Sequence, residues 1–364
     1  MNQQTTLYQT HLDLEAKMVP FGGWDMPVQY SGIINEVKAV RTASGIFDVS
    51  HMGRLYISGP QAGAFLDRML TGSATGLRQG RARYCLICNE SGGVIDDTIF
   101  YRLGDDEYLL IPNAGNRPSV VEWFNQWIES EFSGGVSIDD RTTETGLIAL
   151  QGSGAAALLD GICTLSGGEL PSSLRFFTWG EGDLGSHQVF VGRTGYTGED
   201  GFELSMSNQD AAAVWNALAE AGALPCGLGA RDVLRLEAAL PLHGHEIDAS
   251  TSPIEAGLDR FVRREGDYIG QPVLAQQRND GTERKLVGLT LPGRSAPRAE
   301  YPILAAGQEV GRITSGSFSP TLDTSIAMGY VLAGHSESGT TLDVDIRGRT
   351  ATATVVPLPF YSRS

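Results

Sequence analysis

The sequence predicts an α+β protein of two or three domains, the last of which is a β-barrel or sandwich. The chain has 364 residues, which is more than one hydrophobic core usually organises. Stretches with helical spacing of apolar residues alternate with short strand-like runs over residues 1–277. After residue 284 the chain is almost entirely short β runs separated by Gly, Pro and Ser, a pattern typical of a barrel or sandwich.

Five stretches have the apolar spacing expected of helices. In residues 31–43, one apolar stripe consists of Ile33, Ile34, Val37 and Val40. Ser31 is a candidate N-cap and Gly45 supplies a stop. The other predicted helices cover residues 60–70, 118–128, 209–220 and 229–240.

The predicted strands fall into two groups, before and after a polar segment at 278–284 that we predict to be a linker. The first group covers residues 83–88, 94–102, 107–111, 147–151 and 188–192. The second covers residues 285–291, 311–314, 326–331, 342–346 and 351–356.

Composition limits the possible partners and the compartment. The net charge of −16 argues against nucleic acid or an anionic membrane as the main partner, and an anionic ligand would need local arginines. Four cysteines are too few for a disulfide scaffold and fit a reducing compartment. The polar segment Met1–Lys17 has no signal-peptide pattern, and no apolar run approaches the ~20 residues that span a bilayer. We therefore expect a soluble, cytoplasmic protein.

Residues 193–204 form the most informative segment, because glycines and functional side chains alternate in it. Gly195, Gly198 and Gly201 prevent a regular helix or strand and favour a tight loop. Arg193, Tyr196, Glu199 and Asp200 lie among them, and alternation puts Phe202 and Glu203 on opposite faces of the strand that follows. The segment predicts either a ligand clamp or a hairpin turn with charged surface residues.

Two adjacent carboxylates, Asp96 and Asp97, interrupt the β-branched and aromatic strand at 92–102. Strand alternation puts them on opposite faces. If both faces are buried, desolvation raises the pKa of at least one aspartate, which is a common way to make a general base or a charge stabiliser. The alternative is an edge strand with one carboxylate in water and the other capping a turn.

Three other motifs carry weaker signals. Cys85 and Cys88 have CxxC spacing without a second pair or a nearby His, so we interpret them as structural. His243 and His245 lack a third metal ligand at a recognisable spacing. The glycine-rich segment 227–232 fails the dinucleotide fingerprint, but it places Arg231 in the first turn of a helix.

Taken together, the motifs resemble one family. They are Lys17-Met-Val-Pro-Phe-Gly-Gly-Trp-Asp-Met-Pro27, Asp48-Val-Ser-His-Met-Gly53, Asn89-Glu-Ser-Gly-Gly-Val-Ile-Asp-Asp97, the 193–204 loop, Gly227-Leu-Gly-Ala-Arg-Asp-Val-Leu-Arg-Leu-Glu237 and Ile313-Thr-Ser-Gly-Ser-Phe-Ser-Pro320. In this order they resemble the aminomethyltransferase family, the T protein of the glycine cleavage system, over nearly the whole chain.

The resemblance implies a three-domain, cloverleaf-like fold that binds tetrahydrofolate in a central channel. The expected domains are a discontinuous folate-binding domain at 1–50 and 140–277, an inserted domain at 51–139 and a C-terminal β-barrel at 285–364. The implied reaction takes an aminomethyl group from the lipoylated arm of the H protein and gives ammonia and 5,10-methylenetetrahydrofolate. No metal is implied.

The resemblance also implies roles for individual residues. Asp97 is the expected catalytic carboxylate, Glu203 binds the donor edge of the pterin, and Tyr196 helps to enclose it. Arg231 holds an acceptor or a charged part of folate, as expected of an arginine in an acidic protein. The remaining expected substrate-binding residues are Met52, Tyr84, Asn113 and Tyr361.

The chain departs from the family pattern at three places. His243 and His245 stand in Leu242-His-Gly-His-Glu246, where the family has Leu-Tyr-Gly followed by Gln or Asn. Phe176 or Phe177 replaces a tyrosine that closes the folate pocket. Arg363 comes one place later than the pattern, which leaves its role and that of Tyr361 open.

Two alternative functions remain. A related folate-dependent demethylase would act on a small sulfur or amine compound, and the unbroken Gly-Gly-Val-Ile-Asp-Asp motif favours the transferase over it. A non-catalytic folate-binding protein for iron–sulfur assembly would carry a cysteine in its glycine-rich tyrosine loop, and the 193–204 loop has none.

Overall fold

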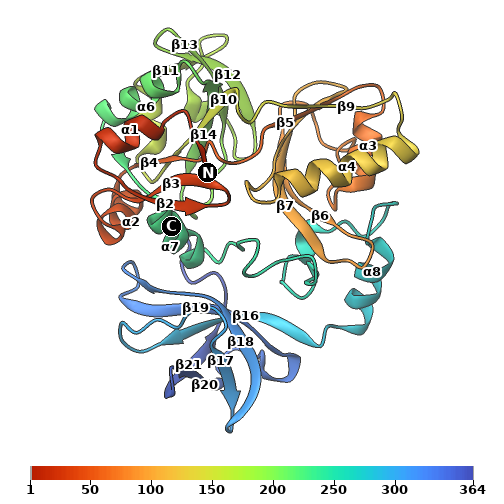
Figure 1. Cartoon of the computed structure of the whole chain (residues 1–364), viewed down its shortest axis with the longest axis vertical. Coiled ribbons are helices and arrows are strands. Elements are labelled where there is room, and N and C mark those ends of the chain that lie inside the picture. Colours follow the sequence, from red (N-terminus) through yellow and green to blue (C-terminus); the bar gives the residue numbers. More distant parts are fainter. Residues whose placement is uncertain (1, 364) are drawn as a thin grey trace.

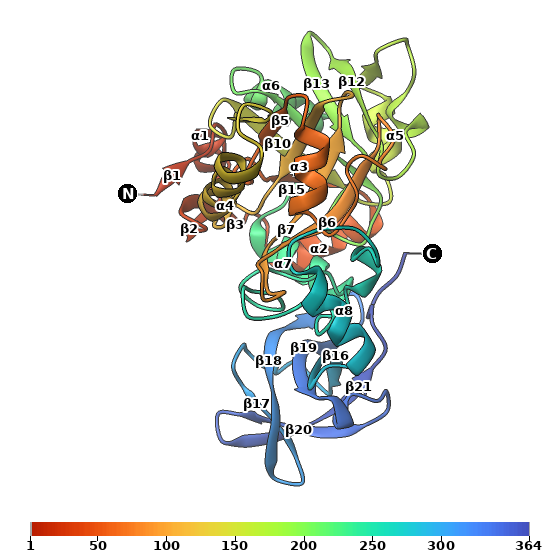
Figure 2. The ribbon, with the colours of Figure 1, turned by 90° about the vertical axis from the view of Figure 1, so that its right-hand side faces the viewer.

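The computed structural model describes residues 2–363 and shows three lobes around a common centre (Figure 1). The first lobe holds a three-stranded and a seven-stranded sheet, the second a five-stranded sheet, and the third a closed six-stranded barrel. Turned by a right angle, the molecule has the barrel at one end and the two α+β lobes at the other (Figure 2). The predicted α+β cloverleaf with a C-terminal barrel is confirmed.

The first lobe is built from segments far apart in the sequence. Its small sheet has the order β1 (Gln3–Gln4), β3 (Trp24–Gln29), β2 (Lys17–Phe21). Its large sheet has the order β11 (Cys163–Leu165), β12 (Trp179–Leu184), β13 (His187–Gly192), β14 (Gly201–Ser207), β10 (Thr145–Gln151), β4 (Gly45–Asp48), β15 (Leu224–Pro225). Its helices are α1 (Tyr8–Asp13), α2 (Ile33–Thr42), α5 (Ala155–Asp160), α6 (Ala211–Glu220) and α7 (Leu228–Glu237).

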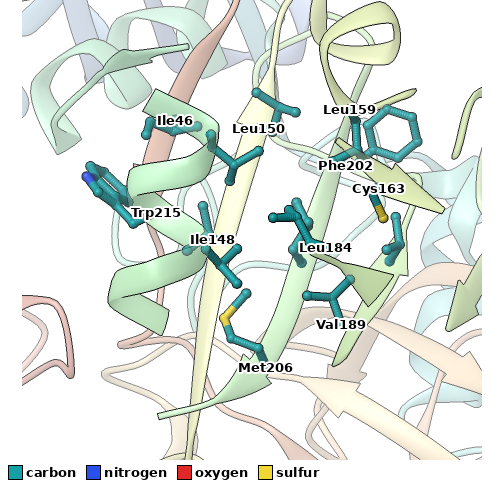
Figure 3. Packing of buried hydrophobic residues seen from close by; sticks show 14 of the residues in the cluster. Ile46, Ile148, Leu150, Leu159, Cys163, Leu184, Val189, Phe202, Met206 and Trp215 are labelled. Carbon is teal, nitrogen blue, oxygen red and sulfur yellow. The ribbon is translucent and has the colours of Figure 1, made fainter. Parts of the chain in front are cut away.

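One face of the large sheet forms the core of this lobe. Ile148 and Leu150 on β10 and Phe202 on β14 are fully buried, and Trp215 of α6 packs with them (Figure 3). The residues that alternate with these on β14, Glu203 and Ser205, point to the other face, toward the second lobe. The predicted opposite placement of Phe202 and Glu203 is confirmed. Because Phe202 faces the core, Glu203 faces the second lobe.

The second lobe is one antiparallel sheet covered by two helices. Its strands have the order β6 (Ala82–Cys88), β7 (Val94–Arg102), β8 (Glu107–Ile111), β5 (Leu55–Ser58), β9 (Ser137–Asp140). The helices are α3 (Ala62–Met69) and α4 (Arg117–Glu131). Phe65 of α3 and Phe124 of α4 meet edge to face in its core, with ring centres 5.2 Å apart. Because β7 lies between β6 and β8, the edge-strand interpretation of the aspartate pair is wrong.

The third lobe is a barrel with a core of aliphatic residues. Around it run β16 (Arg284–Leu291), β19 (Thr324–Leu332), β18 (Gln308–Ser319), β17 (Pro302–Ala305), β20 (Thr341–Ile346) and β21 (Arg349–Val356). Helix α7 contacts β18 and β19 as well as α2 and β3, so it joins the barrel to the first lobe. Sheet membership agrees with the expected division into domains for the strands before residue 226 and after residue 283, whereas buried residues between Ile247 and Leu274 share a cluster with Leu86, Cys88 and Val94 of the second lobe. The domains at 1–50 with 140–277, 51–139 and 285–364 stay a proposal.

Two local predictions are wrong. Residues 278–280 are not linker, because α8 spans Gln271–Asp280 and β16 begins at Arg284. Ser31 does not cap α2; Gly32 is its N-cap, and the Glu36 carboxylate instead accepts hydrogen bonds from the backbone N–H groups of Tyr30 and Gly32. These bonds hold the turn that leads into α2, a role of Glu36 that the sequence pattern alone does not reveal.

Two general expectations can be compared with residues 2–363. None of the helices there is both long enough and apolar enough to cross a membrane. All four cysteines are free and buried, including Cys85 and Cys88 on β6.

Candidate active site

The aspartate pair lies on the central part of β7, buried on both faces of its sheet. Asp96 has no exposed surface and Asp97 is 9% exposed. On β6 they are opposite Ile87 and Leu86 respectively. An apolar strand therefore carries two carboxylates out of water, and each needs polar partners to stay there.

Asp97 accepts hydrogen bonds from two predicted site residues. The Tyr84 hydroxyl donates to Oδ2 at 2.9 Å, and the Asn113 side-chain amide donates to Oδ1 at 2.9 Å. Tyr84 comes from β6 and Asn113 from the segment between β8 and α4, so the sheet brings the three together. These bonds fix the orientation of the carboxylate.

Asp96 is engaged entirely by amides. Its Oδ2 accepts from the backbone N–H of Asn113 at 2.9 Å, and its Oδ1 accepts from the side-chain amides of Asn113 at 2.8 Å and Asn116 at 2.6 Å. Asn116, which precedes α4 as its N-cap residue, was not predicted. The Asn-x-x-Asn spacing after a buried strand is the sequence signal that points to it. Asp96 thus holds the loop that presents Asn113 to Asp97.

The environment of the pair shifts its protonation equilibria. Burial raises the pKa of both carboxyls, and the charge of Asp97 raises the pKa of Asp96 further. Hydrogen bonds from Tyr84 and Asn113 and the charge of His243 act in the opposite direction on Asp97. Burial also raises the pKa of Tyr84, and the neighbouring Asp97 carboxylate adds to this rise, so Tyr84 remains a hydrogen-bond donor.

The 193–204 loop connects β13 to β14 and packs tightly on its neighbours. A Cβ at Gly195 would lie 2.0 Å from the Gln151 side chain, and one at Gly198 would lie 2.7 Å from Ala238, so a larger residue at either position would have to displace its neighbour. Gly198 also has a φ of +79°. The loop joins two neighbouring antiparallel strands, as the hairpin-turn interpretation expects. Its close packing fixes the position of Tyr196.

Tyr196 and Arg231 form a stacked pair. The Arg231 guanidinium lies 4.7 Å from the centre of the Tyr196 ring, and the Tyr196 hydroxyl donates to the carbonyl of Pro241. Arg231 Nη1 is buried and, among residues 2–363, has no hydrogen-bond partner. Burial lowers the pKa of Arg231, and the charges of Glu203 and Tyr196 oppose that shift. An unpartnered guanidinium N–H beside an aromatic ring is available to an acceptor on a ligand.

In the described part of the chain, residues 2–363, the Glu203 carboxylate has one polar side-chain partner. Thr194 donates its hydroxyl to Glu203 Oε2 at 2.6 Å, and Thr194 in turn lies 2.8 Å from the Tyr101 hydroxyl. Thr194 was not predicted; it precedes Gly195 in the same loop. Among residues 2–363 no hydrogen bond involves the other carboxylate oxygen, Oε1, which can accept from N–H groups of a ligand.

The remaining predicted residues lie in two different surroundings. Met52 is partly buried against the core that contains Tyr101 and Phe47, where Phe177 also packs. Tyr361 instead belongs to a groove of about 550 Å³. Its hydroxyl donates to Glu199 Oε1 at 2.7 Å, and the Arg41 guanidinium lies 4.0 Å from the centre of its ring. The structure therefore does not bring Tyr361 into the hydrogen-bonded group around Asp97.

Two of the positions that depart from the family pattern, Phe176 and Arg363, line this groove. Phe176 is 46% exposed and lines the groove, and the Arg363 guanidinium lies 5.4 Å from the centre of its ring. Phe177 turns away toward the Met52 cluster.

The two histidines make separate backbone contacts. His243 Nε2 lies 3.1 Å from the Val94 carbonyl, and His245 Nδ1 lies 3.0 Å from the Thr314 carbonyl. Among residues 2–363, no three His, Cys, Asp or Glu side chains are grouped so that they could hold a metal ion.

Comparison with known proteins decides the family. The GCVT N-terminal domain model matches residues 7–266, and the glycine cleavage T-protein C-terminal barrel domain model matches residues 284–362. The chain is similar to the aminomethyltransferase of Symbiobacterium thermophilum, with 47% identity covering 99% of this chain and 97% of that protein. It is similar to the aminomethyltransferase of Moorella thermoacetica, with 48% identity covering 99% and 98%.

The chain belongs to the glycine cleavage T-protein family. Its fold agrees: the crystal structure of the glycine cleavage system aminomethyltransferase T from Bartonella henselae superposes with a TM-score of 0.92 at 33% identity, covering 99% of this chain and 98% of that one. The predicted family is confirmed, and with it the activity of a folate-dependent aminomethyltransferase of the glycine cleavage system.

Proposed function

We propose that this T-protein family member transfers the one-carbon unit of an aminomethyl group, carried on the lipoyl arm of the H protein, to tetrahydrofolate. The observation that carries the assignment of the site is Asp97, a buried carboxylate oriented by Tyr84 and Asn113. It lies near Tyr196: burial is the main cause of the raised pKa of that tyrosine, and the charge of Asp97 adds to it.

The residues present fit a reduced folate. The pterin ring of folate offers an amino group and ring N–H donors, which match the free Oε1 of Glu203. The unpartnered Nη1 of Arg231 fits a carbonyl or carboxylate oxygen of the same molecule. Tyr196, held by its bond to Pro241 and by Arg231, supplies an aromatic face. In this proposal Met52 lines the apolar side of the pocket, and Tyr361 contacts the outer part of the ligand from the groove.

The transfer balances without an oxidant or reductant. The donor is a thioether of the form R–S–CH₂–NH₂, and tetrahydrofolate supplies two N–H groups as the acceptor. The C–S and C–N bonds of the donor break, and the carbon forms two new bonds to folate nitrogens. One of the two folate hydrogens ends on sulfur, which gives the thiol, and the other ends on nitrogen, which gives ammonia.

Asp97 acts on the charge that this exchange develops. A cationic carbon–nitrogen centre forms as sulfur departs, and an oriented carboxylate stabilises positive charge most strongly in a site that excludes water. Tyr84 and Asn113 keep the carboxylate in place, so little reorganisation is needed during the reaction. Asp96, whose oxygens are already occupied by amides, serves as the anchor of this arrangement.

We further propose that the lipoylated H protein is the physiological partner and that the protein works in the cytoplasm. Four free cysteines support a reducing compartment. The net charge of −16 makes nucleic acid and anionic membranes poor partners. The carrier protein as the source of the one-carbon unit follows from membership of the T-protein family.

The proposal is tested by incubating the purified chain with aminomethylated H protein and tetrahydrofolate. We expect equimolar ammonia and 5,10-methylenetetrahydrofolate, with no product when the lipoyl group is missing. Formation of 5-methyltetrahydrofolate from a small methylated sulfur or amine compound, without the carrier, would instead support the folate-dependent demethylase. Folate binding without either reaction would support the non-catalytic alternative.

A further inference from the structure

A chain of three polar side chains crosses from the second lobe to the first and ends on Glu203. Tyr101 belongs to β7, the strand that carries Asp97, whereas Thr194 and Glu203 belong to the first lobe. The Tyr101 hydroxyl lies 2.8 Å from the Thr194 hydroxyl, which lies 2.6 Å from Glu203 Oε2. Thr194 has no exposed surface, and Tyr101 is 2% exposed. Two buried hydroxyls thus connect the strand of the aspartate pair to the carboxylate proposed to bind folate.

The direction of both hydrogen bonds follows from the chemistry of the groups. An ionised carboxylate only accepts, so Thr194 donates its single hydrogen to Glu203 Oε2. The Thr194 oxygen is then an acceptor, and the Tyr101 hydroxyl is the donor to it. Burial raises the pKa of Tyr101, and the charge of Glu203 adds to that rise, so the hydroxyl keeps its hydrogen. Every hydrogen of the chain therefore points toward Glu203.

The backbone of β13 makes room for this chain. Gly192 is the partner of Glu203 in the pairing of β13 with β14, and a Cβ at Gly192 would lie 2.7 Å from the Tyr101 hydroxyl oxygen. The Phe190 ring meets the Tyr101 ring edge to face, with ring centres 5.1 Å apart. The Tyr101 hydroxyl is therefore confined against Gly192, beside Glu203.

Water has little room to replace the Thr194 hydroxyl as a donor. The cavity beside Glu203 at this interface between the lobes has a volume of about 10 Å³, enough for no more than about one water molecule. Apolar side chains, among them Leu109 and Leu147, make up much of its lining. Within residues 2–363, Thr194 is the one residue that donates a hydrogen bond to Oε2. The orientation of the carboxylate therefore depends on Thr194.

We propose that Thr194, supported by Tyr101, is a positioning residue that sets the preference of the protein for the amino-bearing edge of the pterin. With Oε2 held by Thr194, the Glu203 carboxylate presents Oε1 to the N–H donors of the ligand in one orientation. An acceptor that is already oriented loses little freedom when the ligand binds, so its contact with these donors contributes more to affinity. The inference rests on the proposed function, since it concerns the contact between Glu203 and the pterin.

The decisive variants are Thr194→Val and Thr194→Ser. Valine keeps the branched shape of threonine and removes the hydroxyl, whereas serine keeps the hydroxyl and removes the methyl group. The serine variant is therefore the matched control at the same position.

A second pair of variants tests the outer hydroxyl of the chain. Tyr101→Phe keeps the ring and removes the donor to Thr194. Tyr268→Phe is its control, because Tyr268 is also 2% exposed and donates a hydrogen bond of 2.8 Å, to the carbonyl of Arg263 instead. Both substitutions remove one buried hydroxyl, but only the first acts on the chain that ends at Glu203.

The measurement is calorimetric affinity for tetrahydrofolate and for its analogue in which a methyl group replaces the pterin amino group. The Kd of the analogue divided by that of tetrahydrofolate gives the preference for the amino-bearing edge. A merely structural defect weakens both ligands and leaves this ratio unchanged. In Thr194→Val we expect the ratio to fall by about two- to tenfold, the equivalent of one hydrogen bond, and in Tyr101→Phe by a smaller factor. Thr194→Ser and Tyr268→Phe should keep the ratio of the unmodified protein.

A ratio in Thr194→Val that equals or exceeds that of the unmodified protein would overturn the inference, and so would equal losses in Thr194→Val and Thr194→Ser. Should Thr194→Val not fold, the second pair gives the answer. An unchanged ratio in Tyr101→Phe, or the same loss in Tyr268→Phe, would then refute the role of the chain.

Glu203→Gln separates this inference from the proposed function. If Glu203→Gln abolishes the preference while Thr194→Val keeps it, the inference is wrong and the proposed pterin contact stands. If the ratio in Glu203→Gln equals that of the unmodified protein, Glu203 does not meet the amino-bearing edge, and the proposed contact fails together with the inference. In the Glu203→Gln background, Thr194→Val should have no further effect on the ratio, because the two residues act through one contact.

Discussion

Replacing each of the two adjacent aspartates by asparagine should separate the catalytic residue from the structural one. At Asp97 the substituted side chain keeps Oδ1 as the acceptor for Asn113, and the Tyr84 hydroxyl can rotate to accept from the new amide. We expect Asp97→Asn to cost less than about 1 kcal/mol of the free energy of unfolding. Loss of the charge should slow transfer by about 10²- to 10³-fold, the range for removal of one oriented electrostatic group.

Asp96→Asn has the opposite profile, because both oxygens of Asp96 face only donors. The amides of Asn113 and Asn116 donate to Oδ1, and the backbone N–H of Asn113 donates to Oδ2. An asparagine must direct its own NH₂ at one of these sets, and each buried donor left unpaired costs about 1–3 kcal/mol. We expect a clear loss of stability, and a loss of transfer that follows from displacement of the Asn113 loop.

The assay combines urea unfolding with single-turnover rates at saturating tetrahydrofolate. Folate affinity, measured by calorimetry, should change little in Asp97→Asn. Near-normal turnover in Asp97→Asn, together with an inactive but fully stable Asp96→Asn, would mean that the roles assigned to the two carboxylates are reversed.

Three further predictions concern folate binding and acid stability. Glu203→Gln turns one acceptor into a donor beside Thr194 and the ligand, so folate affinity measured by calorimetry should fall roughly tenfold or more; an unchanged affinity removes Glu203 from the pocket. Arg231→Ala should weaken binding by about 1.5–3 kcal/mol, more for polyglutamylated folate if the arginine meets the tail and equally for all tail lengths if it meets the pterin; full affinity throughout would make Arg231 structural. Although burial raises the pKa of Asp48, hydrogen bonding and charge from His11 bring it to about 2, below the unfolded value of 3.8. The resulting stabilisation of about 2 kcal/mol should be present above pH 4 and disappear as the pH falls from about 4 to 2; urea unfolding should show this loss in the unmodified protein and a flatter pH dependence in Asp48→Asn.

The local pattern of the sequence predicted most secondary structure. The strand at 94–102 agrees in both bounds with β7, and the runs after residue 284 are strands of the barrel. These elements repeat apolar residues with the period of their own structure, so local information is enough. The same information placed the linker wrongly at 278–284, because a polar helix such as α8 has little periodicity to reveal it.

The fold brings Tyr84 and Asn113 to Asp97, but the sequence did not predict which of these side chains form hydrogen bonds with one another. Tyr84 and Asn113 bind Asp97 only because β6, β7 and β8 are neighbours in one sheet. Asn116 and Thr194 were missed. The Asn-x-x-Asn spacing after a buried strand is the one sequence signal for Asn116, and Thr194 carries no signal until its partner is known. Tyr361, predicted from the resemblance, lies in a groove with Arg41 and Glu199, and its contact with folate stays a proposal.

By itself the sequence determined the α+β class, the C-terminal barrel, the family and the identity of the two carboxylates, because periodicity, glycine spacing and motif order are properties of the linear chain. Only the tertiary structure showed how the surroundings of the two carboxylates differ, and the catalytic role of Asp97 stays a proposal. Strand alternation alone does not distinguish the roles of Asp96 and Asp97. Only amides of Asn113 and Asn116 donate to Asp96, whereas Asp97 also accepts from the Tyr84 hydroxyl. Hydrogen-bond partners and electrostatic neighbours are set by distances between segments far apart in the sequence, so no local pattern contains them.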